Sequence, residues 1–91
     1  MATIAVWHKL DEEHAAAVLE QAAEKLGSAD GEMVLDFVGM RQIHSQVLRQ
    51  LENFAALADE KRVKVVLHGV NIDIYRVLKL VKLTTRFSFV S

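Results

Sequence analysis

The sequence predicts a small α/β domain, with a largely parallel sheet of about four strands packed with three helices. Two observations predict this class. Short apolar segments rich in β-branched residues alternate with longer segments of helical periodicity, and no proline interrupts them. Each helix returns the chain to the same end of the sheet, which makes the strands parallel. With 91 residues and no linker-like stretch, we expect one domain over residues 1–91.

The first strand is predicted over residues 3–7, a short β-branched and aromatic segment that ends in Trp7. Trp7 is expected in the core. Apolar residues at helical spacing then predict a helix over residues 11–26. We expect Asp11 to cap its first turn and Gly27 to end it, because these residue types favour those positions.

The second strand and second helix follow a turn. The turn residues are Asp30-Gly31, and the nearly continuous apolar run Met33–Val38 predicts the strand. An amphipathic helix is predicted over residues 45–60, with Phe54 among its core residues.

The remaining elements continue the alternation. Residues 63–67 predict a third strand, and Asn71 is expected to cap a helix over residues 72–83. Val81 belongs to the inward face of that helix by its spacing. The alternating segment 86–90 predicts a last strand at the edge of the sheet.

The loops that follow the strands gather at one edge of such a sheet, where α/β proteins place their function. Here these loops are residues 8–10, 39–44 and 68–70.

Composition excludes several classes of function. The 11 basic and 12 acidic residues leave a net charge of -1, which argues against nucleic-acid binding. No apolar stretch approaches the roughly 18 residues of a membrane helix. The first six residues lack the features of a signal peptide, and there is no cysteine. We therefore expect a cytoplasmic protein without membrane insertion.

No catalytic or cofactor motif is present. Glycines 31, 39 and 69 are isolated, so there is no phosphate-binding loop, and Asp36 has no partner base. His44 beside Ser45 does not make a catalytic triad, because sequence neighbours rarely hold that geometry. The four histidines lack metal-ligand spacing. We expect no enzyme activity, no cofactor and no metal.

Residues 8–89 resemble a STAS domain, the fold of anti-sigma-factor antagonists. Three segments carry the resemblance: Leu10-Asp11 before the first helix, the strand and turn Val34–Met40, and Ile43–Leu48 at the head of the second helix. The family has Ile-Asp-Ser, then Ser or Thr, then Gly-Leu in the last of these. The later strand 63–67 and the helix with Arg76-Val77-Leu78 also match the family.

The family's phosphorylation site is altered. Where family members carry the hydroxyl that a kinase modifies, this chain has Gln46, and His44 and Val47 replace the flanking Asp and Gly. Ser45 remains. It is either the N-cap of the second helix or a displaced phosphosite.

The resemblance implies a partner-binding surface at the head of the second helix, formed by Gly39, Met40, Arg41, Gln42, His44, Ser45, Gln46 and Arg49. It implies a protein partner of one of two kinds. The first is an anti-sigma-type kinase, with this chain as a regulator not phosphorylated at the usual site. The second is an ABC transporter subunit, with this chain as the small STAS component of a lipid-transporting complex.

Two further surfaces are expected. Many family members have an additional strand before residues 3–7, so an exposed sheet edge there would allow a homodimer. Arg76, Lys79 and Lys82 form a basic stripe on the third helix, which is either a solvated face or a docking face for an acidic surface.

Overall fold

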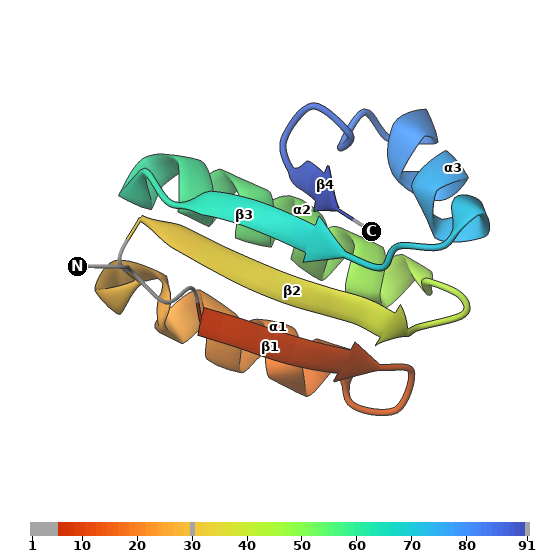
Figure 1. Cartoon of the computed structure of the whole chain (residues 1–91), viewed down its shortest axis with the longest axis horizontal. Helices are drawn as coiled ribbons and strands as arrows, with labels where there is room; N and C mark the ends of the chain where they lie inside the picture. The colour runs from red at the N-terminus through yellow and green to blue at the C-terminus, as the bar shows by residue number, and fades with distance from the viewer. Residues whose placement is uncertain (1–5, 30, 91) are drawn as a thin grey trace.

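The computed structural model describes residues 6–29 and 31–90. Within these residues it contains four strands and three α-helices in the predicted alternating order (Figure 1). The elements are β1 (Val6–Asp11), α1 (Ala15–Glu24), the 3-10 turn η1 (Leu26–Ser28), β2 (Glu32–Gly39), α2 (Ser45–Lys61), β3 (Lys64–His68), α3 (Ile72–Leu80) and β4 (Ser88–Val90). The predicted fold class is confirmed.

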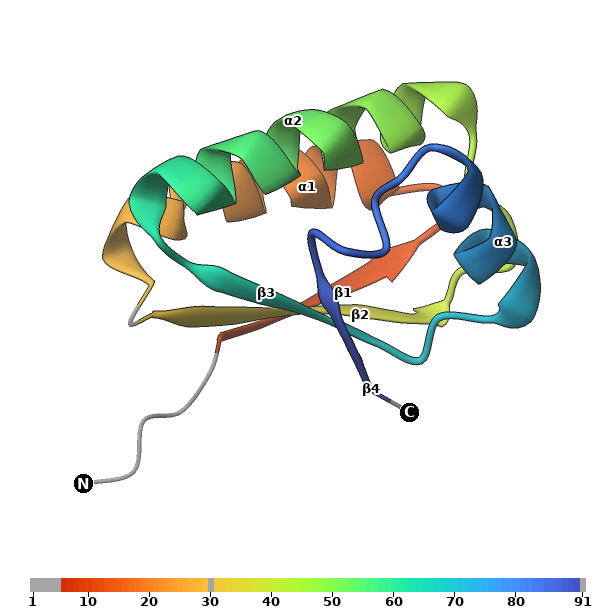
Figure 2. The ribbon, with the colours of Figure 1, turned by 90° about the horizontal axis from the view of Figure 1, so that it is seen from above.

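The sheet has the strand order β1-β2-β3-β4, and every neighbouring pair is parallel. Parallel crossovers are right-handed, so strands added successively on one side place their helices on one face of the sheet. Figure 2 shows this arrangement: α1 and α2 lie together over one face, and α3 lies beside the carboxyl ends of β2 and β3. No helix of the described residues covers the other face, which we call the open face.

The core lies between the sheet and the two covering helices. Met33, Leu35 and Phe37 alternate along β2 and are fully buried, because alternate residues of a strand point to the same face. The predicted inner stripe of α2 meets them, and its members Val47, Leu51, Phe54, Ala55 and Ala58 are all buried. The core position of Phe54 is therefore confirmed.

Strand β1 differs from its prediction. Residues 3–5 lie outside the described residues, and the strand continues to Asp11, so the predicted loop at residues 8–10 is wrong. Trp7 is 55% exposed on the open face, which corrects its assignment to the core. Leu10 is the residue of β1 that is fully buried. The short apolar segment indicated a strand, but only the arrangement of the helices decides which face is covered.

The ends of α1 also differ. Asp11 does not cap the helix: its Oδ1 accepts the backbone N–H groups of Glu13 and His14 at 3.0 and 2.8 Å, in a turn before the helix begins at Ala15. Gly27 lies inside the 3-10 turn η1, and the cap residue of α1 is Lys25. Asparagine and aspartate favour both turns and caps, so spacing alone could not separate the two roles. Asp30 lies outside the described residues.

The carboxyl-terminal elements agree with their predictions better than the amino-terminal ones do. The Asn71 side chain caps α3 as predicted, since its Oδ1 accepts the Ile74 N–H at 2.8 Å. The helix ends at Leu80, so Val81 is 37% exposed and does not face inward. Strand β4 is at the edge of the sheet as predicted, although it is shorter than residues 86–90.

His8 supplies a pH prediction. Burial, and next the charge of Lys25, lowers the pKa of His8, whose buried Nε2 has no hydrogen-bond partner among the described residues. The folded state thus binds this proton less readily than the unfolded state, so stability is complete above about pH 6.5 and falls as the pH drops below it. We expect the Tm to decrease by at most a few degrees between pH 7.5 and 5.5, because the ring is partly solvated.

The measurement is thermal unfolding of the wild type and His8→Gln over that pH range. His8→Gln removes the titrating group and should flatten the profile, whereas the control His44→Gln changes an exposed ring and should keep the wild-type slope. An unchanged slope in His8→Gln would rule out this explanation.

Candidate functional site

The loop between β2 and α2 lies at the carboxyl edge of the sheet. All strands are parallel, so this edge also receives the turn after β1 and the segment after β3. Side chains from three different parts of the chain therefore meet around the head of α2. Open α/β sheets characteristically bind their ligands at this edge.

Two side chains fix the loop from opposite sides. The Glu12 carboxylate, in the turn after β1, accepts the backbone N–H groups of Arg41 and Gln42 at 3.1 and 3.0 Å. The Asn71 amide, at the start of α3, donates to the carbonyls of Met40 and Arg41 at 3.2 and 3.0 Å. The loop backbone is thus held before any partner arrives, which lowers the entropic cost of binding.

Neither Glu12 nor Asn71 was among the predicted site residues. The sequence indicated a cap at Asn71, and its Oδ1 performs that role. The amide nitrogen of the same side chain reaches the loop because α3 lies beside it. Such a contact spans about 30 positions of sequence and leaves no local pattern.

Met40 is the predicted site residue that the structure places elsewhere. Its side chain is 3% exposed and belongs to the hydrophobic core, so it anchors the loop from beneath and is not part of a surface. The other predicted residues are all exposed. We call them the α2 rim: Gly39, Arg41, Gln42, His44, Ser45, Gln46 and Arg49.

Ser45 is not the N-cap of α2, which corrects that interpretation. The cap residue is His44, whose backbone is extended and whose side chain makes no capping hydrogen bond. Ser45 is the first helical residue and is exposed. Its hydroxyl group makes no hydrogen bond to any residue in the described part of the chain. The remaining alternative, a displaced phosphosite, stays a prediction.

The α2 rim carries positive charge and hydrogen-bonding groups. Arg41 and Arg49 are exposed, and none of the seven residues is acidic. The one carboxylate that reaches the loop, Glu12, points its oxygen at backbone amides. Surfaces with arginine and amide side chains suit reversible protein contacts.

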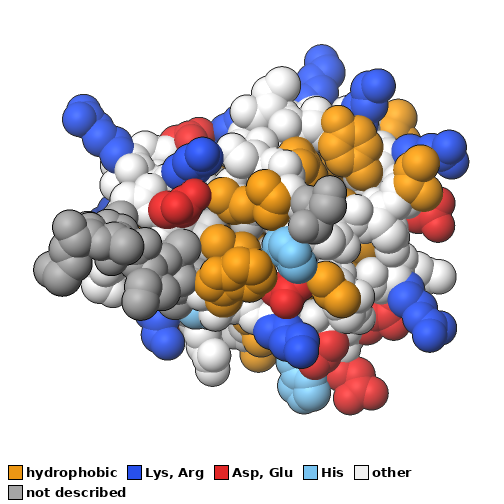
Figure 3. All heavy atoms as spheres, in the orientation of Figure 1, with side chains coloured by type: hydrophobic (Ala, Val, Ile, Leu, Met, Phe, Trp, Pro, Cys, Tyr) orange, Lys and Arg blue, Asp and Glu red, His pale blue; other side chains and the backbone are white. Residues whose placement is uncertain are grey.

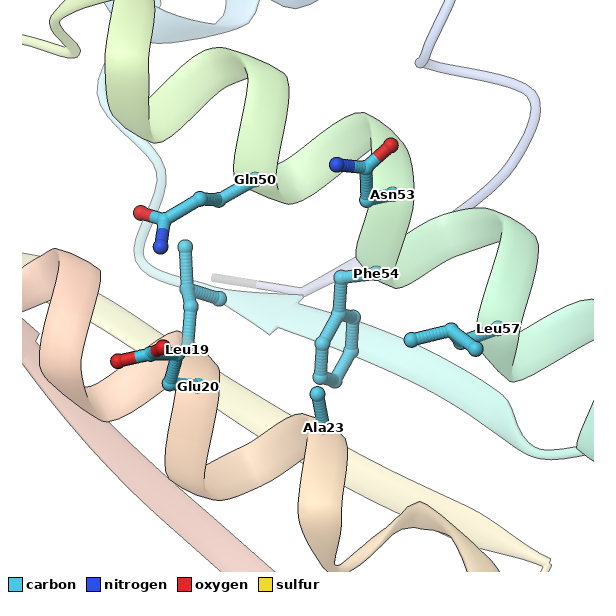
Figure 4. Close-up of a pocket in the computed structure, with 7 residues that line it drawn as sticks. All are labelled: Leu19, Glu20, Ala23, Gln50, Asn53, Phe54 and Leu57. Carbon is cyan, nitrogen blue, oxygen red and sulfur yellow. The ribbon is translucent and has the colours of Figure 1, made fainter.

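An apolar hollow continues this surface along α2, and the sequence did not predict it. Figure 4 shows it between α1 and α2. Its volume is about 190 Å³. Phe54 points across it toward Ala23, and Leu57 stands beside it with 39% of its surface exposed. The lining residues are Leu19, Glu20, Ala23, Gln50, Asn53, Phe54 and Leu57.

Gln50 joins the α2 rim to the hollow. Its Nε2 donates to the Ala16 carbonyl of α1 at 3.4 Å, and its Oε1 is buried without a partner among the described residues. A buried carbonyl oxygen that lacks a donor costs free energy until one is supplied. The hollow itself has apolar walls where Leu19, Ala23 and Phe54 line it.

Comparison with known proteins identifies the family. A family model described as "Mlab, STAS domain" matches residues 2–90, which is nearly the whole sequence. The chain belongs to the STAS domain family. The resemblance drawn from the segments around Asp11, Asp36 and Ser45 is thereby confirmed.

A solved structure has the same fold as this STAS domain. It is the crystal structure of a candidate anti-sigma factor antagonist from Thermotoga maritima, with a TM-score of 0.72 and 20% sequence identity. The match covers 90% of this chain and 72% of the other. At this identity the likeness concerns the fold. No curated protein matches the sequence.

Residues 6–29 and 31–90 of this STAS domain contain no cluster of three or more His, Asp or Glu side chains that would hold a metal ion. Over the same residues, no helix has both the length and the apolar character to cross a membrane.

Proposed function

We propose that this STAS domain is a regulatory protein-interaction module that docks one protein partner through the α2 rim and the adjoining hollow. The observation that carries the proposal is the loop of residues 40–44, whose backbone is held by Glu12 and Asn71 while most of its side chains are exposed. A rigid, exposed and polar loop beside an apolar hollow fits a contact with another protein.

The chemistry of the surface defines the partner's matching surface. Arg41 and Arg49 favour an acidic patch on the partner, because opposite charges steer association and fix orientation. The hollow accepts one apolar side chain next to Phe54 and Leu57. A partner element that presents an acidic residue and an apolar residue a few positions apart would fit both.

The partner is an anti-sigma-type kinase in our first proposal. Gln46 has no hydroxyl, so docking is not controlled by phosphorylation at the family's usual position. Phosphorylation of Ser45 would add negative charge at the amino end of α2, where the helix dipole stabilises it. Incubation with the kinase and ATP should leave the protein unmodified, and stoichiometric phosphate on Ser45 would refute this version.

A second candidate function rests on the same missing hydroxyl. A constitutive subunit needs no control by phosphorylation. The chain could therefore be the small STAS subunit of a lipid-transporting ABC complex. The ATPase subunit would then occupy the α2 rim. Co-purification with an ATPase and a permease favours this candidate, and co-purification with a kinase favours the first.

The remaining expectations belong to the same proposal. The module acts in the cytoplasm as one domain over residues 1–91, without enzyme activity, metal or cofactor. The basic stripe of Arg76 and Lys79, followed by Lys82, stays solvated, because these side chains are exposed.

The experiment is capture of partners by the tagged full chain, followed by affinity measurement with the purified partner. Arg49→Glu and Leu57→Glu should each weaken binding at least about 10-fold, since a charge reversal or a charge in an apolar contact typically costs more than 1.4 kcal/mol. Both side chains are exposed, so the fold should persist in circular dichroism.

Lys79→Glu is the matched control. It reverses an exposed charge on α3 and should leave the affinity within about twofold of the wild type. Equal affinities for the wild type, Arg49→Glu and Leu57→Glu would overturn the proposed docking surface.

A further inference from the structure

The open face of the sheet is exposed to a degree that is unusual for parallel strands. Parallel sheets are almost always covered on both faces, whereas here both covering helices lie on the same side (Figure 2). Figure 3 views the open face: apolar side chains gather near its middle, with acidic and basic side chains around them. Trp7, Val38 and Val90 are 55%, 62% and 48% exposed. Large apolar residues grouped on an uncovered face mark an interaction surface.

The strand register arranges the open face in complementary rows. Across β2 and β3, Glu32 pairs with Lys64, Val34 with Val66, and Asp36 with His68. Paired residues of neighbouring strands point to the same face. Trp7 shows that this is the open face, because its ring packs edge-on against the His68 ring with 5.1 Å between the ring centroids. Each row thus joins an acidic residue to a basic one, or two apolar residues.

The last row is already joined by a hydrogen bond within the chain. His68 Nδ1 lies 3.3 Å from Asp36 Oδ1, and the two side chains are 27% and 16% exposed. Burial raises the pKa of Asp36, but the Val38 amide, the His68 side chain and the charge of Lys9 outweigh it and lower the pKa overall. The Asp36 side chain therefore stays charged on the open face.

These rows make the open face complementary to itself. A two-fold axis parallel to the strands, placed midway between β2 and β3, stacks β2 of one copy on β3 of a second copy. Glu32 then meets Lys64 of the second copy, and Asp36 meets His68. Val34 and Val66, which are only 5% and 7% exposed, form the apolar floor between these two charged rows. An axis perpendicular to the strands would instead stack Glu32 on Asp36 and bring like charges together.

We propose that the open face is the interface of a homodimer in which β2 and β3 stack on β3 and β2 of a second copy about an axis parallel to the strands. Stacked sheets lie about 10 Å apart and rotate by about 30°, so the match is closest for these two central strands. The α2 rim lies at the edge of the sheet and on its helical side, so the dimer leaves the rim free.

The dimer is weak. Four strands spaced about 4.8 Å apart, with about five residues each, give a footprint of roughly 300 Å² per copy. Stable complexes bury about 800 Å² per partner, so association is expected only at high micromolar concentration. The surface is smaller than that of an obligate dimer.

Sedimentation equilibrium from about 10 μM to 1 mM tests the proposal, with charge reversals that separate contacts between copies from contacts within one. The wild-type mass should rise with concentration from 10.2 kDa toward twice that value. Glu32→Lys places lysine opposite Lys64, and Lys64→Glu places glutamate opposite Glu32, so each variant alone should remain a monomer. An equimolar mixture should associate, because the opposed residues are again of opposite charge between the two copies.

The mixture is the decisive measurement. Residues 32 and 64 of each variant chain carry like charges whether or not the variants are mixed, so only contacts between copies can change on mixing. Glu24→Lys and Lys79→Glu are the matched controls: they change net charge equally but lie on α1 and α3, so each alone should dimerise like the wild type. A wild-type mass that stays at 10.2 kDa over the whole range, or a mixture that stays monomeric, overturns the proposed dimer. Neither result bears on binding at the α2 rim, which is measured with the partner at low micromolar concentration.

Discussion

Replacing Phe37 with alanine is expected to remove a large part of the domain's stability. Phe37 is fully buried in the middle of β2, beneath the covering helices. Truncation of a buried phenylalanine costs about 3–5 kcal/mol, from lost burial and from the cavity that remains. Domains of this size have only about 5–14 kcal/mol of stability. The Tm should fall by roughly 15–25 °C, and urea unfolding should give the same loss of free energy.

Val38→Ala is the matched control for this prediction. Val38 is the next residue of the same strand, but it is 62% exposed because it points to the open face. Its truncation should cost less than about 1 kcal/mol. Comparable losses in Phe37→Ala and Val38→Ala would contradict the assignment of a covered face and an open face to the sheet.

Asn71→Ala is expected to have the second-largest effect, on both stability and the candidate site. The substitution removes the cap of α3 and the two hydrogen bonds that hold the loop carbonyls of Met40 and Arg41. A cap contributes about 1 kcal/mol and each further hydrogen bond about as much, so the loss of unfolding free energy should be about 2–3 kcal/mol. Faster amide exchange at Arg41 and Gln42, whose N–H groups donate to Glu12, should report the freed loop.

Asn71→Ser separates the two roles of this side chain. Serine keeps a capping oxygen for the Ile74 amide, but it is too short to bridge to the loop. We expect Asn71→Ser to recover roughly 1 kcal/mol of stability relative to alanine, while the loop amides exchange as fast as in Asn71→Ala. Slow exchange in the serine variant would show that Asn71 does not hold the loop.

Local chemistry in the sequence was sufficient for the order of the elements. The apolar stripe of α2 is repeated at helical spacing over 17 residues, and the cap at Asn71 is a single-residue signal with a direct physical basis. The residues predicted for the partner-binding surface are exposed except for Met40, because residues 41–49 adjoin a helix start and a parallel sheet places such a start at its carboxyl edge. The predictions that Asp11 caps the first helix and that Gly27 ends it were wrong, because turns and helix ends use the same residue types.

Sequence reasoning was sufficient for the alternation of strands and helices, for the parallel sheet and for the loops after the second and third strands. These features depend on periodicity and on turn or cap chemistry, which act over a few neighbouring residues. Tertiary structure alone decided that Trp7 is exposed, that Met40 is buried, and that Glu12 and Asn71 hold one loop between them. Each of these depends on which face the helices cover and on contacts between distant segments, and a crossover rule that puts both helices on one face leaves no mark in any short stretch of sequence.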